Sequence, residues 1–220
     1  FDDMCKIDST TIYQSLSAVA PTIPPMIPPM IPPDIWTIIA KYCDFKQLLL
    51  LRALCRNIRS RIIITEIPFT YKQLLNDEIL SNFPYLTCLH AEAKSWITDK
   101  SVVKLTSLTT LYAGNNHLIT DASVQYLTNL TSLSLHSHHI YSTVTAVSLL
   151  KLTSLTFLNI SGCDSIGDKC LSQLIQLTTL KASDNLYISD LGIETLTNLR
   201  CLHINGGTHI TPAGVNKLKK

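Results

Sequence analysis

Four of the seven histidines are the most obvious candidates for metal chemistry, because His117, His136, His138 and His139 lie close together in the sequence. Imidazole is a common ligand of zinc and nickel, so rings that converge from neighbouring elements could hold such an ion. However, the repeat pattern described below places His136 on an open face and His138 at an inward position, so these two rings diverge. We therefore expect no metal site and no cofactor.

Other catalytic patterns are absent from the sequence, which has no phosphate-cradling glycine loop, no nucleophile elbow and no His-Glu-x-x-His helix. We therefore expect that the chain is not an enzyme. The seven cysteines form no Cys-x-x-Cys pair, and an odd number argues against a disulfide framework. We interpret them as reduced thiols of a cytoplasmic or nuclear protein. They are Cys5, Cys43, Cys55, Cys88, Cys163, Cys170 and Cys201.

The amino-acid composition limits the class of molecule that this chain can bind. The chain has 220 residues, of which 46% are hydrophobic, and this is enough for a sizeable core. Its net charge of +2 gives no strong basic field that would attract nucleic acid or an anionic membrane. No apolar run approaches the roughly 20 residues that cross a bilayer, and the first residues lack the layout of a signal peptide. We expect a protein partner, with no nucleic acid and no membrane.

One pattern organises most of the chain, because a series of six Leu-x-x-Leu motifs recurs with steps of 22, 22, 25, 22 and 22 residues. A fixed period in the twenties is typical of a solenoid, since one such unit cannot bury its apolar face without a stacked neighbour. The six copies are Leu86-x-x-Leu89, Leu108-x-x-Leu111, Leu130-x-x-Leu133, Leu155-x-x-Leu158, Leu177-x-x-Leu180 and Leu199-x-x-Leu202.

Each unit is predicted to contain a strand, a loop and a short helix. Thr-Asp, Gly-Asp or Ser-Asp, which are good helix N-caps, usually precede an apolar pair three residues apart such as Val124 and Leu127. The units resemble leucine-rich repeats of the cysteine-containing type, best seen in Leu199-Arg-Cys-Leu202-His-Ile204 and Ile119-Thr120-Asp121. The resemblance implies an α/β solenoid with short parallel strands on the concave face and helices on the convex face.

The leucine-rich-repeat array is predicted to cover residues 63–220. One period before Leu86, the apolar positions fall on Ile64, Ile67, Phe69, Leu80 and Phe83, so residues 64–85 are predicted to form a degenerate first repeat before the six regular ones. The third regular unit is three residues longer than the others. We expect this insertion, around His138 to Thr145, to bulge from the stack.

The N-terminal part has a different organisation. Residues 1–30 are predicted to be a flexible segment with a proline-rich lead, because repeated Ile-Pro-Pro-Met fixes φ and removes backbone donors. Residues 31–62 are predicted to form three short helices, the first beginning near Pro33. Such a unit is too small to bury a core of its own and needs a partner surface.

This helical stretch resembles an F-box. The matching residues are Ile31-Pro32-Pro33-Asp34-Ile35, Ile38-Ile39, Tyr42, Asp44, Leu48 and Leu51-Arg52-Ala53-Leu54-Cys55-Arg56. The departures from the family pattern, Ile31, Cys43, Leu54 and Ile58, remain apolar or nearly so. The resemblance implies docking on the Skp-type adaptor of a cullin-RING ubiquitin ligase through Ile31, Pro32, Ile35, Ile39, Leu48, Leu51 and Leu54. The alternative is an ordinary helical cap on the first edge of the array.

Candidate target-binding residues occupy the outward strand positions, which face the concave side. They are polar and almost uncharged, with Tyr112 and Phe157 as the large anchors that interface hot spots favour: His90, Tyr112, His136, Phe157, Asn159, Lys181 and His203. A second row lies on the loop rim and includes Trp96 and Tyr187. These two side chains either project outward and extend the contact surface or fold back over the loops.

Two functions of different classes are consistent with the sequence. The first is a substrate-recognition subunit of a Skp/cullin/F-box ubiquitin ligase, which binds the adaptor through residues 31–62 and a target protein through the repeats. F-boxes are eukaryotic modules that viruses and intracellular bacteria also use, so this function includes a pathogen effector that redirects ubiquitination in the host cytoplasm. The second is a non-ligase scaffold in which the helices only cap the solenoid.

Overall fold

The computed structural model describes residues 64–67, 75–93, 95–137 and 143–218. The chain divides into two units, Phe1–Ile63 and Ile64–Lys220, and every described residue belongs to the second. The predicted F-box and its adaptor-binding residues therefore lie outside the described residues. These are Ile31, Pro32, Ile35, Ile39, Leu48, Leu51 and Leu54.

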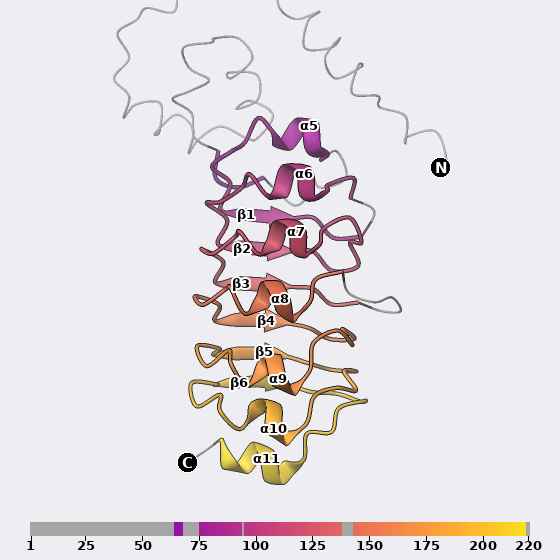
Figure 1. Ribbon diagram of the computed structural model, residues 1–220, viewed down its shortest axis with the longest axis vertical. Helices are drawn as coiled ribbons and strands as arrows, with labels where there is room; N and C mark the ends of the chain where they lie inside the picture. Colours follow the sequence, from indigo (N-terminus) through magenta and orange to yellow (C-terminus); the bar gives the residue numbers. More distant parts are fainter. Residues whose placement is uncertain (1–63, 68–74, 94, 138–142, 219–220) are drawn as a thin grey trace, which may run out of the picture. The chain divides into compact units, whose positions relative to one another are not determined.

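Six short strands form one parallel sheet in sequence order (Figure 1). Each strand lies one repeat further along the chain, so that Leu89 is opposite Leu111, which is opposite Leu133. The central leucine points into the core, and the residues on either side of it point outward. The strands are β1 (Cys88–His90), β2 (Thr110–Tyr112), β3 (Ser132–Ser134), β4 (Phe157–Asn159), β5 (Thr179–Lys181) and β6 (Cys201–His203).

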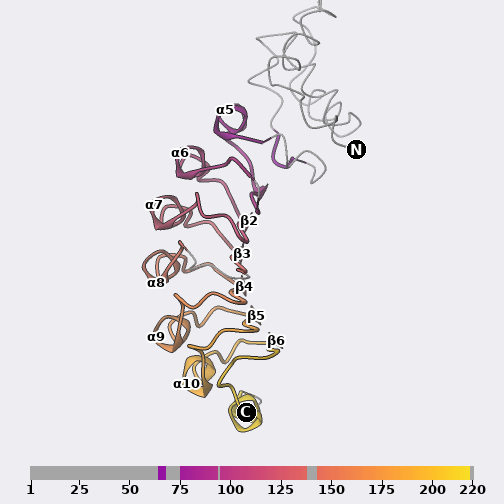
Figure 2. The ribbon, with the colours of Figure 1, turned by 90° about the vertical axis from the view of Figure 1, so that its right-hand side faces the viewer.

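Short helices form the other side of each unit. In Figure 2 the helices follow an outer arc and the strands lie along its inner side, so the sheet lines the concave face. This arrangement confirms the predicted α/β leucine-rich-repeat solenoid. The helices are α5 (Asp77–Leu80), α6 (Asp99–Val102), α7 (Asp121–Val124), α8 (Ala146–Leu149), α9 (Asp168–Leu171), α10 (Asp190–Ile193) and α11 (Pro212–Lys217).

The core between sheet and helices is built from the same positions in successive repeats. Leu86, Leu108 and Leu130 are fully buried, and so are Val102 and Val124, the first residues of two predicted helix pairs. Burial of each such side chain contributes about 1.5–3 kcal/mol relative to exposure. A single repeat has too few of these side chains to fold alone, so the core exists only in the stack.

The degenerate first repeat follows the same frame where it is described. Ile64, Ile67, Leu80 and Phe83 are all buried, and Glu66 forms a parallel bridge with Cys88 of β1. The fifth apolar position, Phe69, lies outside the described residues. The described part of residues 64–85 therefore stacks on the first regular repeat as a further unit.

The predicted bulge in the third regular repeat is wrong for its last three residues. Thr143 Oγ1 donates to the Ile119 carbonyl at 2.5 Å, Val144 is 2% exposed, and Thr145 caps α8. Val144 takes the place that Ile119 and Ile166 occupy in neighbouring repeats. A β-branched side chain at this inward position is buried only where repeats stack on both sides of it. The stack has therefore resumed at Thr143, and residues 138–142 lie outside the described residues.

Hydroxyl groups cap most of the helices, as predicted, but the aspartates have another role. Thr120 Oγ1, for example, accepts from the Ala122 backbone N–H at the start of α7. Asp121 is the first residue inside the helix, and its carboxylate binds the next repeat instead, accepting from the Thr145 backbone N–H at 2.9 Å and from Thr145 Oγ1 at 2.6 Å. Ser148 Oγ donates to the same carboxylate.

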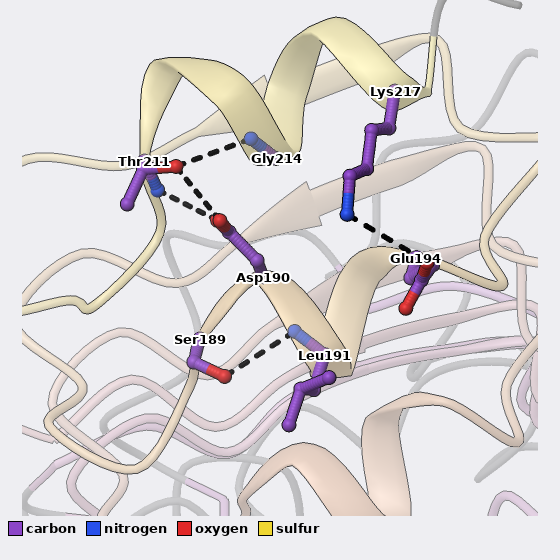
Figure 3. A network of polar contacts seen from close by, with 7 residues as sticks. All are labelled: Ser189, Asp190, Leu191, Glu194, Thr211, Gly214 and Lys217. Atoms are coloured by element: carbon purple, nitrogen blue, oxygen red, sulfur yellow. Dashed lines mark hydrogen bonds and ion pairs between the residues drawn. The ribbon is translucent and has the colours of Figure 1, made fainter.

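The aspartates therefore form a carboxylate–hydroxyl ladder that joins the N-termini of successive helices: Asp77 to Thr98, Asp99 to Thr120, Asp121 to Thr145, Asp168 to Ser189 and Asp190 to Thr211. Figure 3 shows the last rung, in which Asp190 accepts from the Thr211 backbone N–H and hydroxyl, both at 2.7 Å. Thr211 Oγ1 in turn accepts from the Gly214 N–H at 3.2 Å.

The ladder has one missing rung, between α8 and α9. Ala146 stands where the other joined helices have aspartate, and Gly167, which makes no side-chain cap, stands where they have threonine or serine. Both partners of the contact are absent together, so neither a carboxylate nor a hydroxyl is left without its counterpart. Among the described repeats, the step from α8 to α9 is the only one without a carboxylate–hydroxyl hydrogen bond between successive helices.

A second row of hydrogen bonds joins the repeats just before the strands. Each threonine hydroxyl in this row donates to the carbonyl of the threonine one repeat earlier, at 3.1–3.2 Å. The donors are Thr87, Thr109, Thr131, Thr156 and Thr178. Unlike the carboxylate–hydroxyl ladder, this row continues across the step from β3 to β4, because Thr156 donates to Thr131. The row ends at Thr178, since Arg200 stands at the next position and donates to the Thr178 carbonyl through its backbone N–H alone.

Candidate protein-binding surface

The concave face is built from the outward side chains of the six strands. In β1, β2, β4 and β5 the central leucine is buried and the two flanking residues are half-buried. Strand alternation therefore turns the predicted contact residues toward the open side, while parallel pairing fixes the backbone that carries them, on both sides in β2 to β5. Such a face is rigid and can present its side chains with little loss of backbone entropy on binding.

At the N-terminal end of this face, His90 and Tyr112 form a stacked pair. Their ring centroids are 4.5 Å apart, and the ring planes differ by 6°. The two residues are register partners on β1 and β2, so the strand pairing itself holds the rings together. The stack fixes two aromatic side chains before any partner arrives.

The centre of the face is polar. His136 lies against Gly114, where a Cβ atom would be only 2.1 Å from the imidazole ring, so Gly114 is required for the ring to lie there. Ser134 Oγ lies 3.3 Å from His136 Nδ1 and accepts from Asn159 Nδ2 at 3.2 Å. Asn159 Oδ1 accepts from the Ser161 hydroxyl at 2.9 Å. These contacts hold the amide and the imidazole in defined orientations.

At the C-terminal end, Lys181 Nζ lies 5.8 Å from the centroid of the Phe157 ring, a cation–π arrangement. The ammonium group is thereby held over an apolar anchor. His203 is exposed and lies beside Cys201, with 3.1 Å between Nε2 and Sγ. Six of the seven predicted concave-face residues thus lie on the strands, and His136 lies two residues after β3. The described contacts join His90 to Tyr112, His136 to Asn159 through Ser134, and Lys181 to Phe157, while His203 contacts Cys201.

The rim residues are exposed. Trp96 is 74% exposed and Tyr187 is 60% exposed, so both side chains project into solvent rather than folding back over the loops. Each precedes a buried isoleucine, Ile97 or Ile188, which fixes the loop beneath it. Leu186, beside Tyr187, is 56% exposed and was not among the predicted contact residues. The exposure of Leu186 was hard to predict from the sequence, because an isolated leucine in a leucine-rich chain is normally interpreted as a core residue.

Charges near this face are few. Glu66 and Cys88 are bridge partners at its N-terminal end, where burial, and then the negative charge of Glu66, raise the pKa of the Cys88 thiol. Among the described residues, no group of three or more histidine, cysteine, aspartate or glutamate side chains is placed to hold a metal ion. His138 and His139 lie outside them. Nor does any described helix have the length and apolar character needed to cross a membrane.

The sequence matches no protein-family model and no curated protein, but solved structures are similar. Internalin C2 of Listeria monocytogenes is 25% identical, with a TM-score of 0.47, over 63% of this chain and 70% of its own. The internalin InlF of the same organism is 24% identical, with a TM-score of 0.48, over 64% of this chain and 41% of its own.

Yeast Rad7, solved in complex with Elc1, is 20% identical, with a TM-score of 0.55. The similarity covers 71% of this chain and 48% of Rad7, so this chain matches about half of that protein. At this level of identity the similarity concerns the fold. Together with the repeated strand, loop and helix units, it shows that the described part of this chain is a leucine-rich-repeat solenoid.

Proposed function

We propose that this protein is a substrate-recognition subunit of a Skp/cullin/F-box ubiquitin ligase. The concave face of the repeats binds a target protein, and residues 31–62 dock on a Skp-type adaptor. The chain itself contributes binding and no catalytic residue. By holding the target near a ubiquitin-charged enzyme it converts an encounter into a near-intramolecular reaction, an effect worth about 7 kcal/mol or more in favourable cases. Such a receptor acts in the cytoplasm or the nucleus.

The observation that carries the target-binding part is the prearranged concave face. The His90–Tyr112 stack and the Lys181–Phe157 pair hold large side chains in place on a rigid sheet. Aromatic anchors in a polar, nearly uncharged surface are typical of protein interfaces. The exposed side chains of Trp96 and Tyr187 extend this surface along the rim.

The adaptor-binding part rests on the sequence resemblance of residues 31–62 to an F-box. In support of a role in complexes, Rad7, which has the same fold, was solved with its partner Elc1. The alternative function, a scaffold without ligase activity, rests on the same face and differs only in what the N-terminal helices bind. Adaptor binding therefore separates the two functions.

The first experiment is co-expression with a Skp-type adaptor, followed by size-exclusion chromatography and calorimetry on the purified components. We expect a stoichiometric complex that is lost when Pro32 and Leu51 are both replaced by alanine, while the repeats remain folded. A folded wild-type chain that forms no complex would exclude the ligase function and leave the scaffold. A complex that survives the double substitution would refute the assignment of that surface.

The second experiment separates the two surfaces. Replacing Tyr112 and Phe157 with alanine removes both aromatic anchors of the concave face, so target capture should fall while adaptor binding is unchanged. Replacing Trp96 and Tyr187 with alanine tests the rim in the same way. Unchanged capture by the Tyr112/Phe157 variant together with loss in the rim variant would move target recognition to the rim.

A further inference from the structure

The same tripeptide, Cys-Leu-His, forms both the first and the last strand of the sheet. β1 is Cys88-Leu89-His90, and β6 is Cys201-Leu202-His203. In each strand the cysteine and the histidine are two residues apart and share the outward face. The sequence therefore gives no reason for the two thiols to differ, and any difference between them comes from their neighbours.

In β6 the thiol and the imidazole contact each other. Cys201 Sγ lies 3.1 Å from His203 Nε2, at the surface of the molecule. Among the described strands β6 pairs only with β5. In the tautomer that carries its proton on Nδ1, His203 accepts the thiol proton at Nε2. A thiol with a base within hydrogen-bond distance is the usual arrangement of an activated sulfur nucleophile.

In β1 the same two side chains have other neighbours. The imidazole of His90 stacks on the Tyr112 ring, at a centroid distance of 4.5 Å. Cys88 is the bridge partner of Glu66. Burial is the larger cause that raises the pKa of the Cys88 thiol, and the negative charge of Glu66 is the smaller one. Burial and the Glu66 carboxylate both oppose formation of a thiolate at Cys88. β1 is therefore a natural control for β6 within one molecule.

The two remaining described cysteines are inert for a different reason. Cys163 is fully buried, and its thiol donates to the Leu135 carbonyl at 3.2 Å. Cys170 is 3% exposed, and burial raises its pKa to about 11. Neither sulfur is accessible to a reagent while the repeats are folded.

We propose that Cys201, paired with His203, is a modification site for small electrophiles that carry an activated alkene, such as an α,β-unsaturated carbonyl. The thiol proton passes to His203 Nε2, and Sγ forms a bond to the β-carbon of the alkene. The π electrons move to the carbonyl as an enolate, which takes up a proton at the α-carbon from the imidazolium. The reaction is an addition, so no group leaves and no oxidant is consumed.

The adduct would lie on the concave face, since Cys201 and Thr179 are register partners on β6 and β5. A modified Cys201 therefore places a new group at the C-terminal end of that face, beside His203. The chemical proposal does not depend on the proposed function, because the reactivity of the thiol can be measured without adaptor or target.

The test uses N-ethylmaleimide, an activated alkene, at limiting concentration and pH 7 on the full chain, with labelling of each cysteine followed over time by peptide mass spectrometry. We expect Cys201 to react about tenfold faster than Cys88, because thiolate is the reacting form. Cys163 and Cys170 should stay unlabelled, and they report unfolding in every variant. The labelling of Cys5, Cys43 and Cys55 is measured separately, on the peptides that contain them.

Two matched substitutions test the role of the imidazole. His203→Gln should lower the rate at Cys201 severalfold but leave it above that of Cys88, because burial and the Glu66 carboxylate oppose thiolate formation only at Cys88. It should also make the rate at Cys201 fall more steeply as the pH is lowered from 8 to 6.5. His90→Gln should leave the rate at Cys88 unchanged. Equal rates at Cys201 and Cys88 in the wild-type chain, or an unchanged Cys201 rate in His203→Gln with Cys163 and Cys170 still protected, would overturn the proposal.

Discussion

Replacing Asp121 with alanine removes one rung of the carboxylate–hydroxyl ladder and measures what the ladder contributes. The carboxylate accepts from the Thr145 backbone N–H, the Thr145 hydroxyl and the Ser148 hydroxyl. Hydrogen bonds to a charged acceptor contribute about 1.5–3 kcal/mol each. Asp121 is half-buried and water can replace part of the loss, so we take about 3 kcal/mol for all three. This is a large share of the roughly 5–15 kcal/mol typical of a folded domain.

The assay is thermal unfolding followed by circular dichroism. For a unit of this size, 1 kcal/mol lowers Tm by about 2–4 °C, so Asp121→Ala should lower Tm by about 6–12 °C. The control is Asp164→Ala, which removes an exposed carboxylate that is not part of the ladder. The reasoning is refuted if the Asp121→Ala and Asp164→Ala proteins melt within 1–2 °C of each other, a difference of about 0.5 kcal/mol.

Three further predictions concern hydrogen bonds and close contacts between repeats. Burial opposes ionisation of Asp77 and Asp121, but hydrogen bonds outweigh it and lower the pKa of both. The unfolded state therefore binds more protons than the folded state, so Tm should fall as the pH drops below about 4. A Tm that stays constant between pH 5 and 3 would contradict this. Gly192→Ala should lower the free energy of unfolding, measured by urea denaturation, by about 1–2 kcal/mol, because the new Cβ would lie 2.3 Å from Asp168 Oδ1. A gain in stability would mean that the higher helix propensity of alanine outweighs this close contact. Asn185→Ala should cost about 2–3 kcal/mol in urea, since this buried amide bonds three backbone groups, and a loss below 1 kcal/mol would refute that role.

The repeat frame could be predicted from the sequence because the positions that it depends on are apolar and periodic. Leu89, Val124 and Ile166 are each fully buried, as the period requires. The same frame predicted which side chains face outward on the strands. Burial in a solenoid depends on position within the repeat, and position within the repeat is what a period reveals.

Contacts between repeats could not be predicted in the same way. The Thr-Asp pairs were interpreted as helix caps, and the threonines are caps, but the aspartate carboxylates bind the following repeat. That contact depends on how closely two helices stack, which no single repeat specifies. The two Cys-Leu-His strands show the same limit, since a stacked Tyr112 and a bridged Glu66 distinguish Cys88 from Cys201.

The missing rung between α8 and α9 has a consequence for how the array folds and opens. In a repeat protein, stability is a sum of intrinsic and nearest-neighbour terms, so the weakest interface sets where cooperativity breaks. On the helix side we expect the weakest described interface where Ala146 and Gly167 replace the bonded pair, while the threonine row still joins the strands. The array should therefore behave as two cooperative blocks, one on each side of this interface, which remain joined through the pairing of β3 with β4. Amide exchange would then show two protection levels that change between Leu149 and Asp168.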